Sequence, residues 1–290
     1  MQRPEVDEHF LASVVPGFVR LVDKLRGGFK DVFIVETVEN KIALKVCLLN
    51  QQCFNVQETL SLRKRLEREC ELLKKCNSDY VVKPGPIDGG VRVCNGQSLF
   101  IFSEEFIECP SLRQKLKERD LFDAEEALVF LKNMTSVVKH FKELGIIHKD
   151  IKPDNIFSCC SPKKFILTDL GIARVEGEAN LTPTAVLAMT RGYVAPEYLN
   201  EETKNSIDFR ADLFGIGVVC YELLTGRKPT DVTPYQSATD ICDHVPELPK
   251  CLSRVIMRLL EYHPHLRYSR LYQLEADLTE AERVLNGGEC

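Results

Sequence analysis

Hydrophobic and polar positions alternate along the first part of the chain with the two-residue period of β-strands. Short apolar runs of this kind occupy residues 18–22, 32–35 and 42–46. From about residue 56 to 76 the apolar positions recur with a helical period, and residues 80–106 return to the strand pattern. The sequence therefore predicts a strand-rich first part that contains one helix.

The rest of the chain follows a mainly helical pattern. Asp123 is the predicted N-cap of a long amphipathic helix that ends at Gly145. Short strands are predicted at residues 147, 156–157 and 165–167, and a buried helix at about 211–224 precedes further helices. A strand-rich part followed by a helix-rich part predicts a hinge and a cleft near residues 105–111.

Charge and hydropathy exclude two classes of partner. The 290-residue chain has a formal net charge of −5 and no basic stripe, so it lacks the footprint of a nucleic-acid-binding protein. Its longest apolar run, residues 213–224, is interrupted by Glu222 and is shorter than the roughly 20 residues of a membrane span. The first residues have no apolar signal-peptide core. We therefore expect a cytoplasmic protein with neither a nucleic acid nor a membrane as partner.

The twelve cysteines are scattered along the chain. They form no C-x-x-C pair and have no zinc-finger spacing to histidines. Without a secretion signal we expect reduced thiols rather than a disulfide framework. Cys159 and Cys160 are adjacent, and we interpret them as small apolar residues at a strand end rather than as a redox pair.

Two stretches carry candidate chemistry. Residues 147–155 read Ile-His-Lys-Asp-Ile-Lys-Pro-Asp-Asn, and Asp-Leu-Gly begins at Asp169. Phosphoryl transfer from ATP needs positioning, metal ions and an acceptor for the hydroxyl proton rather than covalent catalysis. A carboxylate, a lysine and a carboxamide on one loop, with a second carboxylate on the next turn, offer these groups and the hard oxygen ligands that Mg²⁺ prefers.

These stretches resemble the H-R-D-x-x-x-x-N and D-F-G motifs of the eukaryotic-type Ser/Thr protein kinase family. Further motifs follow in the family's order, namely Ala43-Leu-Lys45, Ala195-Pro-Glu197, the helix that starts near Asp212, and Arg267. The resemblance covers about residues 20–270 and implies an α+β, bilobal protein-kinase fold. It implies a small β-rich N-lobe with helix C at 19–105 and a larger helical C-lobe at 106–290. Residues 1–18 form an N-terminal extension, which either folds as a helix against the N-lobe or docks a partner.

The resemblance also implies the roles of individual residues. Asp150 would accept the proton of the substrate hydroxyl, and Lys152 would neutralise charge on the transferred phosphoryl group; a lysine at this spacing is the Ser/Thr-kinase pattern. The implied catalytic residues are Asp150, Lys152, Lys45 and Glu69, and the implied metal ligands are Asn155 and Asp169. The implied nucleotide-binding residues are Leu25, Gly27, Val32, Ala43, Lys45, Glu105, Ile107 and Phe157. ATP and Mg²⁺ are the implied cofactors, and proteins are the implied substrates.

Other matching positions imply structural roles. His148 would brace the catalytic loop, Thr190 would contact it, and Glu197 with Arg267 would form a buried ion pair. Asp154 and Glu222 stand where some family members read basic substrate residues, which gives a hypothesis for substrate choice.

The glycine loop departs from the family pattern. Of its three glycines only Gly27 is kept, because Leu25 and Lys30 occupy the outer positions. Side chains there limit the close approach of backbone to phosphate, so we expect weaker ATP binding. Lys30 either adds positive charge near the phosphates or points to solvent.

Three further departures lie elsewhere. Lys149 replaces the arginine before the catalytic aspartate. Lysine keeps the positive charge but lacks the guanidinium group that binds an activation-segment phosphate through two hydrogen bonds. Leu170 replaces the phenylalanine of D-F-G and keeps its apolar contact. The gatekeeper is either Glu104, which when buried needs a partner such as Lys45, or Ser103 if the hinge holds one extra residue.

Two alternative functions come from other classes. A pseudokinase that serves as a nucleotide-binding scaffold or allosteric partner is favoured by the altered glycine loop and opposed by the retained charged residues. A small-molecule kinase is opposed by the Ala-Pro-Glu segment and its arginine, which the resemblance assigns to a protein-substrate platform.

Overall fold

The computed structural model describes residues 3–27, 30–49, 56–170, 174–175, 192–198, 207–229 and 238–288. The chain divides into two compact units. The first comprises Met1–Asn77, Val82–Glu108 and Asp169–Gly171, and the second comprises Ser78–Val81, Cys109–Thr168 and Ile172–Cys290.

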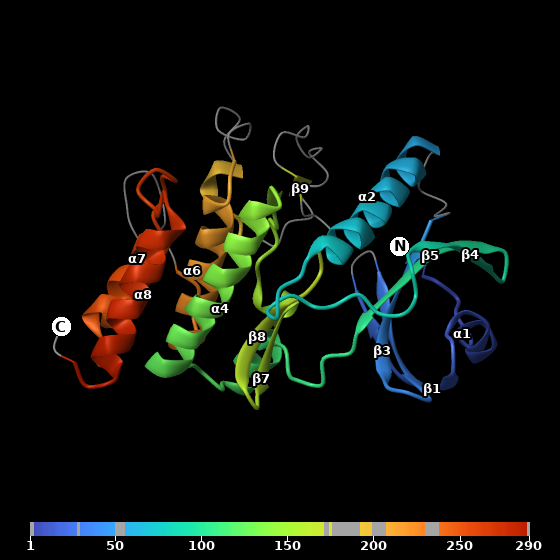
Figure 1. Cartoon of the computed structure of the whole chain (residues 1–290), viewed down its shortest axis with the longest axis horizontal. Coiled ribbons are helices and arrows are strands. Elements are labelled where there is room, and N and C mark those ends of the chain that lie inside the picture. The colour runs from blue at the N-terminus through green and yellow to red at the C-terminus, as the bar shows by residue number, and fades with distance from the viewer. Residues whose placement is uncertain are drawn as a thin grey trace. The chain divides into compact units, whose positions relative to one another are not determined.

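An antiparallel five-stranded sheet forms the centre of the first unit (Figure 1). Its strands are β1 (Phe18–Arg26), β2 (Asp31–Thr37), β3 (Lys41–Leu48), β4 (Gly90–Cys94) and β5 (Gln97–Glu105), in the order β1-β2-β3-β5-β4. The helices are α1 (Glu8–Val14) and α2 (Val56–Lys75). The predicted strands and helix are confirmed, except that residues 80–89 contribute isolated bridges rather than a strand.

Both faces of this sheet are buried because its central strands carry apolar side chains on alternate sides. On one face Leu44 and Ile101 pack with Phe10 and Leu11 of α1. On the other face Phe100 and Phe102 belong to a cluster with Leu66 and Cys70 of α2. One helix therefore covers each face, which explains why strands such as β3 are apolar along nearly their whole length.

The N-terminal residues are part of the first unit. Asp7 caps α1, since its Oδ1 accepts a hydrogen bond from the Phe10 backbone at 2.7 Å. Arg3 donates to the Gly27 carbonyl at 2.7 Å and to the buried carboxylate of Asp31 at 2.8 Å. Of the two expectations for residues 1–18, a helix against the N-terminal sheet is the one observed.

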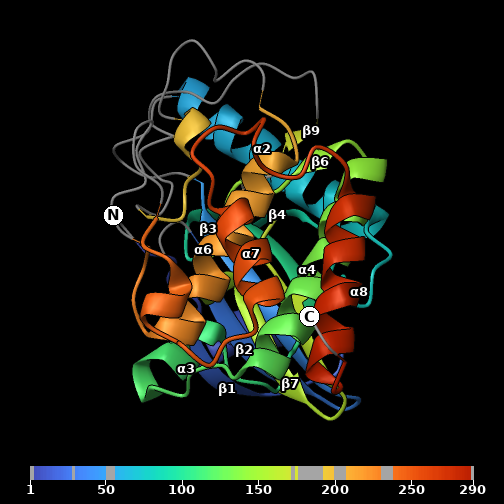
Figure 2. The ribbon, with the colours of Figure 1, turned by 90° about the vertical axis from the view of Figure 1, so that its left-hand side faces the viewer.

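The second unit is mainly helical (Figure 2). Its helices are α3 (Leu112–Glu118), α4 (Ala124–Glu143), α6 (Arg210–Thr225), α7 (Lys250–Leu259) and α8 (Leu271–Leu285). Its short strands are β6 (Ile146–Ile147), β7 (Ile156–Cys160), β8 (Lys163–Leu167) and β9 (Arg174–Val175). Helix α6 packs between α4 and α7, and α8 packs against both of these helices.

Two local features explain how these helices form. Asp123 caps α4 as predicted, with its Oδ1 accepting from the Glu126 backbone at 2.8 Å. Helix α6 is buried almost all round, and a Cβ on Gly217 would lie 2.8 Å from the Leu259 side chain. Only glycine permits this close packing of α6 on α7.

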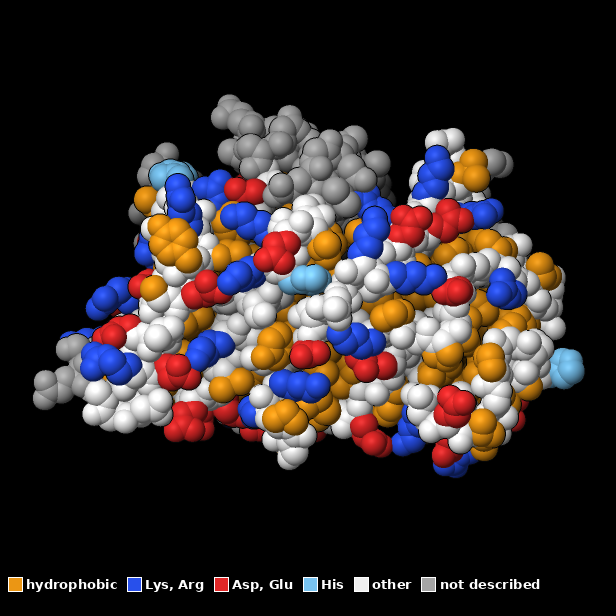
Figure 3. Space-filling view, viewed as in Figure 1, with side chains coloured by type: hydrophobic (Ala, Val, Ile, Leu, Met, Phe, Trp, Pro, Cys, Tyr) orange, Lys and Arg blue, Asp and Glu red, His pale blue; other side chains and the backbone are white. Residues whose placement is uncertain are grey.

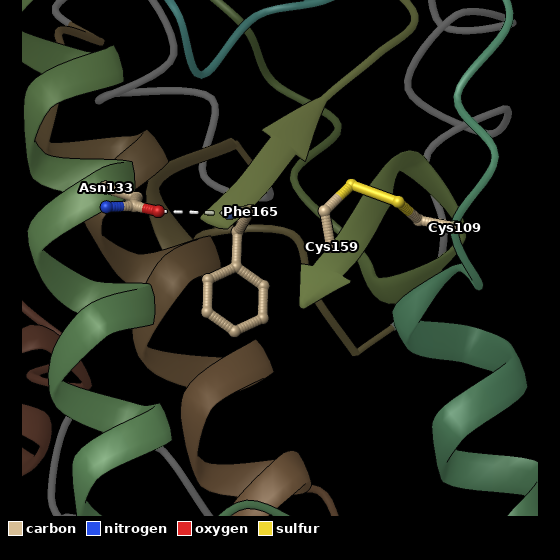
Figure 4. The surroundings of a disulfide bond; sticks show 4 residues. All are labelled: Cys109, Asn133, Cys159 and Phe165. Carbon is tan, nitrogen blue, oxygen red and sulfur yellow. Dashed lines mark hydrogen bonds between the residues drawn. A yellow bond between two sulfur atoms is a disulfide. The ribbon is translucent and has the colours of Figure 1, made fainter. Parts of the chain in front are cut away.

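Cys109 and Cys159 form a disulfide bond, which corrects the expectation of reduced thiols at these two positions (Figure 4). The segment after β5 runs beside β7, where the Ser158 backbone donates to Pro110 at 2.9 Å. This pairing brings the two Cα atoms to 5.3 Å although 50 residues separate them in the sequence. Figure 4 also shows Asn133 of α4 accepting a hydrogen bond, 3.0 Å long, from the Phe165 backbone of β8.

None of the helices within the described residues combines the length and the apolar character that a bilayer crossing requires.

Replacement of Leu11 by alanine tests whether α1 is integral to the first unit. Leu11 is fully buried, so Leu11→Ala is expected to lower the free energy of unfolding by about 2–5 kcal/mol. Denaturant unfolding measures the change. Val38→Ala is the control, because Val38 is 75% exposed. A loss no larger than that of the control would mean that α1 contributes nothing to the stability of this unit.

Candidate active site

Lys45 of β3 is paired with Glu104 of β5. The register of the two strands sets Ala43 opposite Glu104, so Lys45 lies diagonally across from it on the same face. The Lys45 Nζ is 2.5 Å from Glu104 Oε1 and 3.8 Å from Glu69 Oε1. Both side chains of the Lys45–Glu104 pair are buried. Lys45 thus lies within ion-pair distance of both carboxylates, and Glu104 is the nearer of the two.

The same register distinguishes the two candidate gatekeepers. The Ser103 hydroxyl accepts a hydrogen bond from the Ile87 backbone at 2.8 Å, on the other face of β5. Glu104 is thus the residue that faces Lys45, and the partner that its burial requires is the one predicted.

Lys30, at the third glycine position of the loop, lies beside Glu69. Its Nζ donates to Glu69 Oε1 at 2.6 Å, to Glu69 Oε2 at 2.8 Å and to Asp169 Oδ1 at 2.8 Å. The alternative that Lys30 points to solvent is wrong, because its side chain is only 14% exposed. Burial alone would lower the pKa of the Lys30 ammonium, but the Asp169 and Glu69 carboxylates outweigh it and raise the pKa above its ordinary value.

Helix α2 supplies Glu69 from its buried side. Glu69 is 1% exposed, whereas Glu67 lies on the exposed side and pairs with Arg63 at 2.8 Å. The glutamate that the resemblance implies, Glu69, thus lies on the buried side of the helix. Sequence reasoning missed that Lys30 joins Glu69 to Asp169, and the signal for it was a lysine at a glycine position.

The other predicted nucleotide-binding residues of the first unit lie on its strands and on the segment after β5. Leu25 is half exposed at the end of β1, Val32 pairs with Lys45 across β2 and β3, and Ala43 is partly exposed. The Glu105 backbone N–H donates to the Lys83 carbonyl at 3.0 Å, and Ile107 is partly exposed.

In the second unit the catalytic-loop residues come together. Lys152 Nζ is 2.5 Å from Asp150 Oδ2, and Asn155 Nδ2 donates to the Asp150 backbone carbonyl at 2.9 Å and to its Oδ2 at 3.1 Å. Phe157, the predicted nucleotide contact of this unit, is partly exposed on β7. The arrangement presents a carboxylate beside an ammonium, which suits acceptance of a hydroxyl proton next to a negatively charged group.

A buried carboxylate anchors this loop. Asp212 of α6 accepts hydrogen bonds from the backbone N–H groups of His148 at 2.8 Å and Lys149 at 2.9 Å. Burial raises the pKa of the Asp212 carboxyl, although these donors and His148 oppose the shift. His148 is fully buried and its ring stacks on Phe141, which is the bracing role predicted for it.

The residues predicted to hold Mg²⁺ fit a hard cation. Asn155 turns its amide nitrogen toward Asp150, so its oxygen is the atom left for a ligand role. The Asp169 side chain is 34% exposed and supplies a carboxylate. Within the described residues no three His, Cys, Asp or Glu side chains form a metal cluster.

Glu197 and Arg267 form the predicted buried ion pair. Arg267 donates from Nη1 and Nη2 to the two Glu197 oxygens at 2.7 and 2.9 Å. It also donates to the carbonyls of Glu261, Arg210 and Tyr262. Arg267 is 1% exposed, so this pair is structural.

The activation segment lies largely outside the described residues. This applies to Thr190, predicted to contact the catalytic loop, and to Gly171 after the Asp-Leu motif.

On the face drawn in Figure 3, Lys and Arg side chains alternate with Asp and Glu over the described residues. This is the mixed surface that a solvated domain presents.

Comparison with known proteins assigns the family. Residues 26–278 match the family model described as the protein kinase domain. The chain belongs to the protein kinase domain family. It is similar to serine/threonine-protein kinase PknD of Mycobacterium tuberculosis (strain ATCC 25618 / H37Rv), with 26% identity over 253 residues that cover 84% of this chain and 36% of PknD. It is also similar to serine/threonine-protein kinase PknA of Nostoc sp. (strain PCC 7120), with 26% identity over 254 residues that cover 84% of this chain and 43% of PknA. The chain thus spans less than half the length of these relatives.

A solved structure shows the fold. The kinase domain of Mycobacterium tuberculosis PknI matches with a TM-score of 0.64 and 19% identity, over 92% of this chain and 99% of that one. The predicted protein-kinase fold is confirmed.

The Glu197–Arg267 pair gives a prediction on stability. Arg267→Met leaves Glu197 buried without its partner and is expected to cost about 3–5 kcal/mol in unfolding free energy. Denaturant unfolding measures this loss. The control is Arg20→Met, because Arg20 and Glu36 form an exposed pair whose loss costs less than about 1 kcal/mol. Equal losses in the two variants would contradict the structural role of Arg267.

Proposed function

We propose that the chain is a Ser/Thr protein kinase that transfers the γ-phosphoryl group of MgATP to protein hydroxyls. The observation that carries this proposal is the Asp150–Lys152–Asn155 cluster, held on a loop anchored by Asp212. Lys152 two residues after Asp150, and the names of the relatives, support serine and threonine as acceptors.

Each catalytic-loop residue has a defined part. The substrate hydroxyl oxygen forms a bond to the γ-phosphorus while the bond from that phosphorus to the β,γ-bridging oxygen breaks and ADP leaves. Asp150 orients the hydroxyl and takes its proton, and Lys152 offsets negative charge on the transferred group. Asn155 holds Asp150 in place through its amide nitrogen.

The first unit supplies residues for the nucleotide. Leu25, Gly27, Val32 and Ala43, with backbone groups of Glu105 and Ile107, are proposed to contact ATP, as is Phe157 of the second unit. Lys45 and Glu69 belong to the charged cluster near the phosphates. Mg²⁺, held by Asn155 and Asp169, would neutralise charge on the phosphates.

We further propose a cytoplasmic location and partners limited to protein substrates. Buried thiols such as Cys47, Cys70 and Cys220 support a reducing compartment, because they are packed as apolar residues rather than paired. The Cys109–Cys159 disulfide is the observation that opposes it.

Phosphate transfer from MgATP to the chain itself and to a generic protein substrate tests the function. Asp150→Ala and Asp169→Asn are each expected to lower the rate at least about 100-fold, since they remove the proton acceptor and a metal ligand. Radiolabelled γ-phosphate incorporation measures it.

Asp88→Ala is the control for this assay, because Asp88 is an exposed carboxylate that pairs with Lys74 at the surface. No transfer by the parent chain at any ATP concentration would replace the proposal by a pseudokinase scaffold. Transfer that survives Asp150→Ala would overturn the role of Asp150.

Arg113 of α3 contacts the two carboxylates that bear on the choice of substrate peptides, Asp154 and Glu222. Its guanidinium donates to Asp154 Oδ2 at 3.0 and 3.1 Å and lies 3.6 Å from Glu222 Oε1. It also donates to the Tyr193 hydroxyl at 2.8 Å, and that hydroxyl donates to Glu222. The two carboxylates that were hypothesised to read basic substrate residues thus have an internal cation as partner.

A peptide library is therefore expected to show no preference for Arg or Lys before the phosphoacceptor. Arg113→Ala is expected to introduce such a preference, of about tenfold per charge pair gained, because it exposes both carboxylates to the peptide. Arg119→Ala, at the opposite end of the same short helix, is the control. A basic preference in the parent chain would contradict this account.

A further inference from the structure

The N-terminal segment contacts the glycine loop through Arg3. One nitrogen of its guanidinium, Nη1, donates to the Gly27 carbonyl at 2.7 Å and to Asp31 Oδ1 at 2.8 Å. Gly27 directly follows β1 and Asp31 is the first residue of β2, so this nitrogen joins the two arms of the loop. We propose that Arg3 is a positioning residue for nucleotide binding, because it holds the glycine loop in one geometry. This inference rests on the proposed function, in that it assigns a further residue to the nucleotide site.

The backbone that carries Arg3 is itself fixed to the sheet. The Glu5 backbone N–H donates to Gln97 Oε1 at 2.8 Å, and Gln97 Nε2 donates to the Arg3 carbonyl at 3.5 Å. The Cys94 thiol donates to the Glu5 carbonyl at 3.3 Å, and Pro4 is buried between these contacts in the sequence. Arg3 therefore extends toward the loop from a segment that is held on β4 and β5.

The burial of Asp31 makes the contact with Arg3 costly to break. The Asp31 side chain is 0% exposed, and Lys24 is its more distant cation, with Nζ 3.7 Å from Oδ2. A buried carboxylate that loses a hydrogen-bonded cation is strongly destabilised. Arg3 is thereby kept at Asp31, and the same nitrogen keeps its bond to the Gly27 carbonyl.

The two arms of the loop lie close together at this point. A Cβ on Gly27 would lie 2.2 Å from the Lys30 carbonyl oxygen. The Lys30 side chain enters a charged cluster of the first unit. The members of this cluster are Lys30, Lys45, Glu69, Glu104 and Asp169. A change in the separation of the two arms would therefore move both the Gly27 backbone and the Lys30 ammonium.

A loop that is held in its binding geometry before the ligand arrives costs less free energy to order on binding. Gly27 is the glycine that the loop retains, and it is proposed to contact ATP. Without Arg3, the loop would have to become ordered when the phosphates bind. The affinity for MgATP would then fall, whereas the affinity for adenosine, which has no phosphates, would change less.

Substitutions of Arg3 test the proposal. Arg3→Met removes both hydrogen bonds, and Arg3→Lys keeps a cation that can lie beside Asp31. Arg20→Met is the matched control, because Arg20 pairs with Glu36 and so joins the same two strands at their end away from the loop. Isothermal titration with MgATP, and separately with adenosine, measures the affinity for the nucleotide with and without its phosphates.

Arg3→Met is expected to weaken MgATP binding about three- to tenfold and to leave adenosine binding within about twofold. Arg3→Lys is expected to bind MgATP more tightly than Arg3→Met, because it restores the cation. Arg20→Met is expected to bind both ligands within about twofold of the parent chain. In phosphate transfer, Arg3→Met is expected to raise the KM for ATP and to keep kcat within about twofold, which a merely structural role would not produce.

Thermal unfolding of each variant checks that it is folded. The Arg3 side chain is 43% exposed, so its replacement is compatible with folding. Arg3→Gln, which keeps a polar side chain near Asp31, takes the place of Arg3→Met if that variant is unfolded.

An MgATP affinity of Arg3→Met equal to that of the parent chain would overturn the inference. Equal weakening of MgATP and adenosine binding, or the same loss in Arg20→Met, would also overturn it, since the effect would then not belong to the loop. Failure of the parent chain to bind MgATP would overturn both this inference and the proposed function. MgATP binding without phosphate transfer would remove only the proposed function, because the affinity comparison does not depend on turnover.

Discussion

The buried carboxylate of Glu104 is the constraint on which the charged cluster of the first unit depends. A carboxylate that is 4% exposed needs a cation, and Lys45 supplies it across the sheet. Glu69 is also buried, at 1% exposure, and its carboxylate lies farther from Lys45, at 3.8 Å. Lys30 supplies the cation for Glu69, because its ammonium group donates to both oxygens of that carboxylate. The acidic residue on β5 and the lysine in place of a loop glycine therefore belong to one balance of charges: Lys45 pairs with Glu104, and Lys30 pairs with Glu69.

The second unit also contains a buried carboxylate, and backbone N–H groups rather than a lysine stabilise it. Asp212 is 2% exposed, and its carboxylate is satisfied by two N–H groups of the catalytic loop. Those bonds hold Lys149 at a φ of 70°, a left-handed conformation that costs energy for a residue with a side chain. The loop is therefore set by a buried anchor, while Asp150 remains partly exposed beside Lys152. Positioning and chemistry are carried by different residues.

The sequence predicted the features that depend on local patterns. Helix α4 and its Asp123 cap follow from periodicity and capping chemistry, and Asp150, Lys152 and Asn155 meet because they lie within six residues. The sequence could not predict the contacts that depend on strand register. A one-residue shift of β5 exchanges Ser103 for Glu104 on the face of Lys45, and the apolar pattern of that strand fits both. The Cys109–Cys159 bond and the Lys30–Asp169 bond join residues 50 and 139 positions apart, which no local signal reveals.

The altered glycine loop contributes to this charge balance, because Lys30 stands at its third glycine position. The cluster holds two ammonium groups against three carboxylates, a formal charge of 2 − 3 = −1. A cluster of that sign attracts a further cation, and Asp169 is the most exposed of its three carboxylates. Lys30 joins two kinds of carboxylate, since Asp169 is its more exposed partner and Glu69 its buried one. The side chain at the third glycine position thus adds a positive charge to the cluster, while Lys45 balances Glu104 on the sheet.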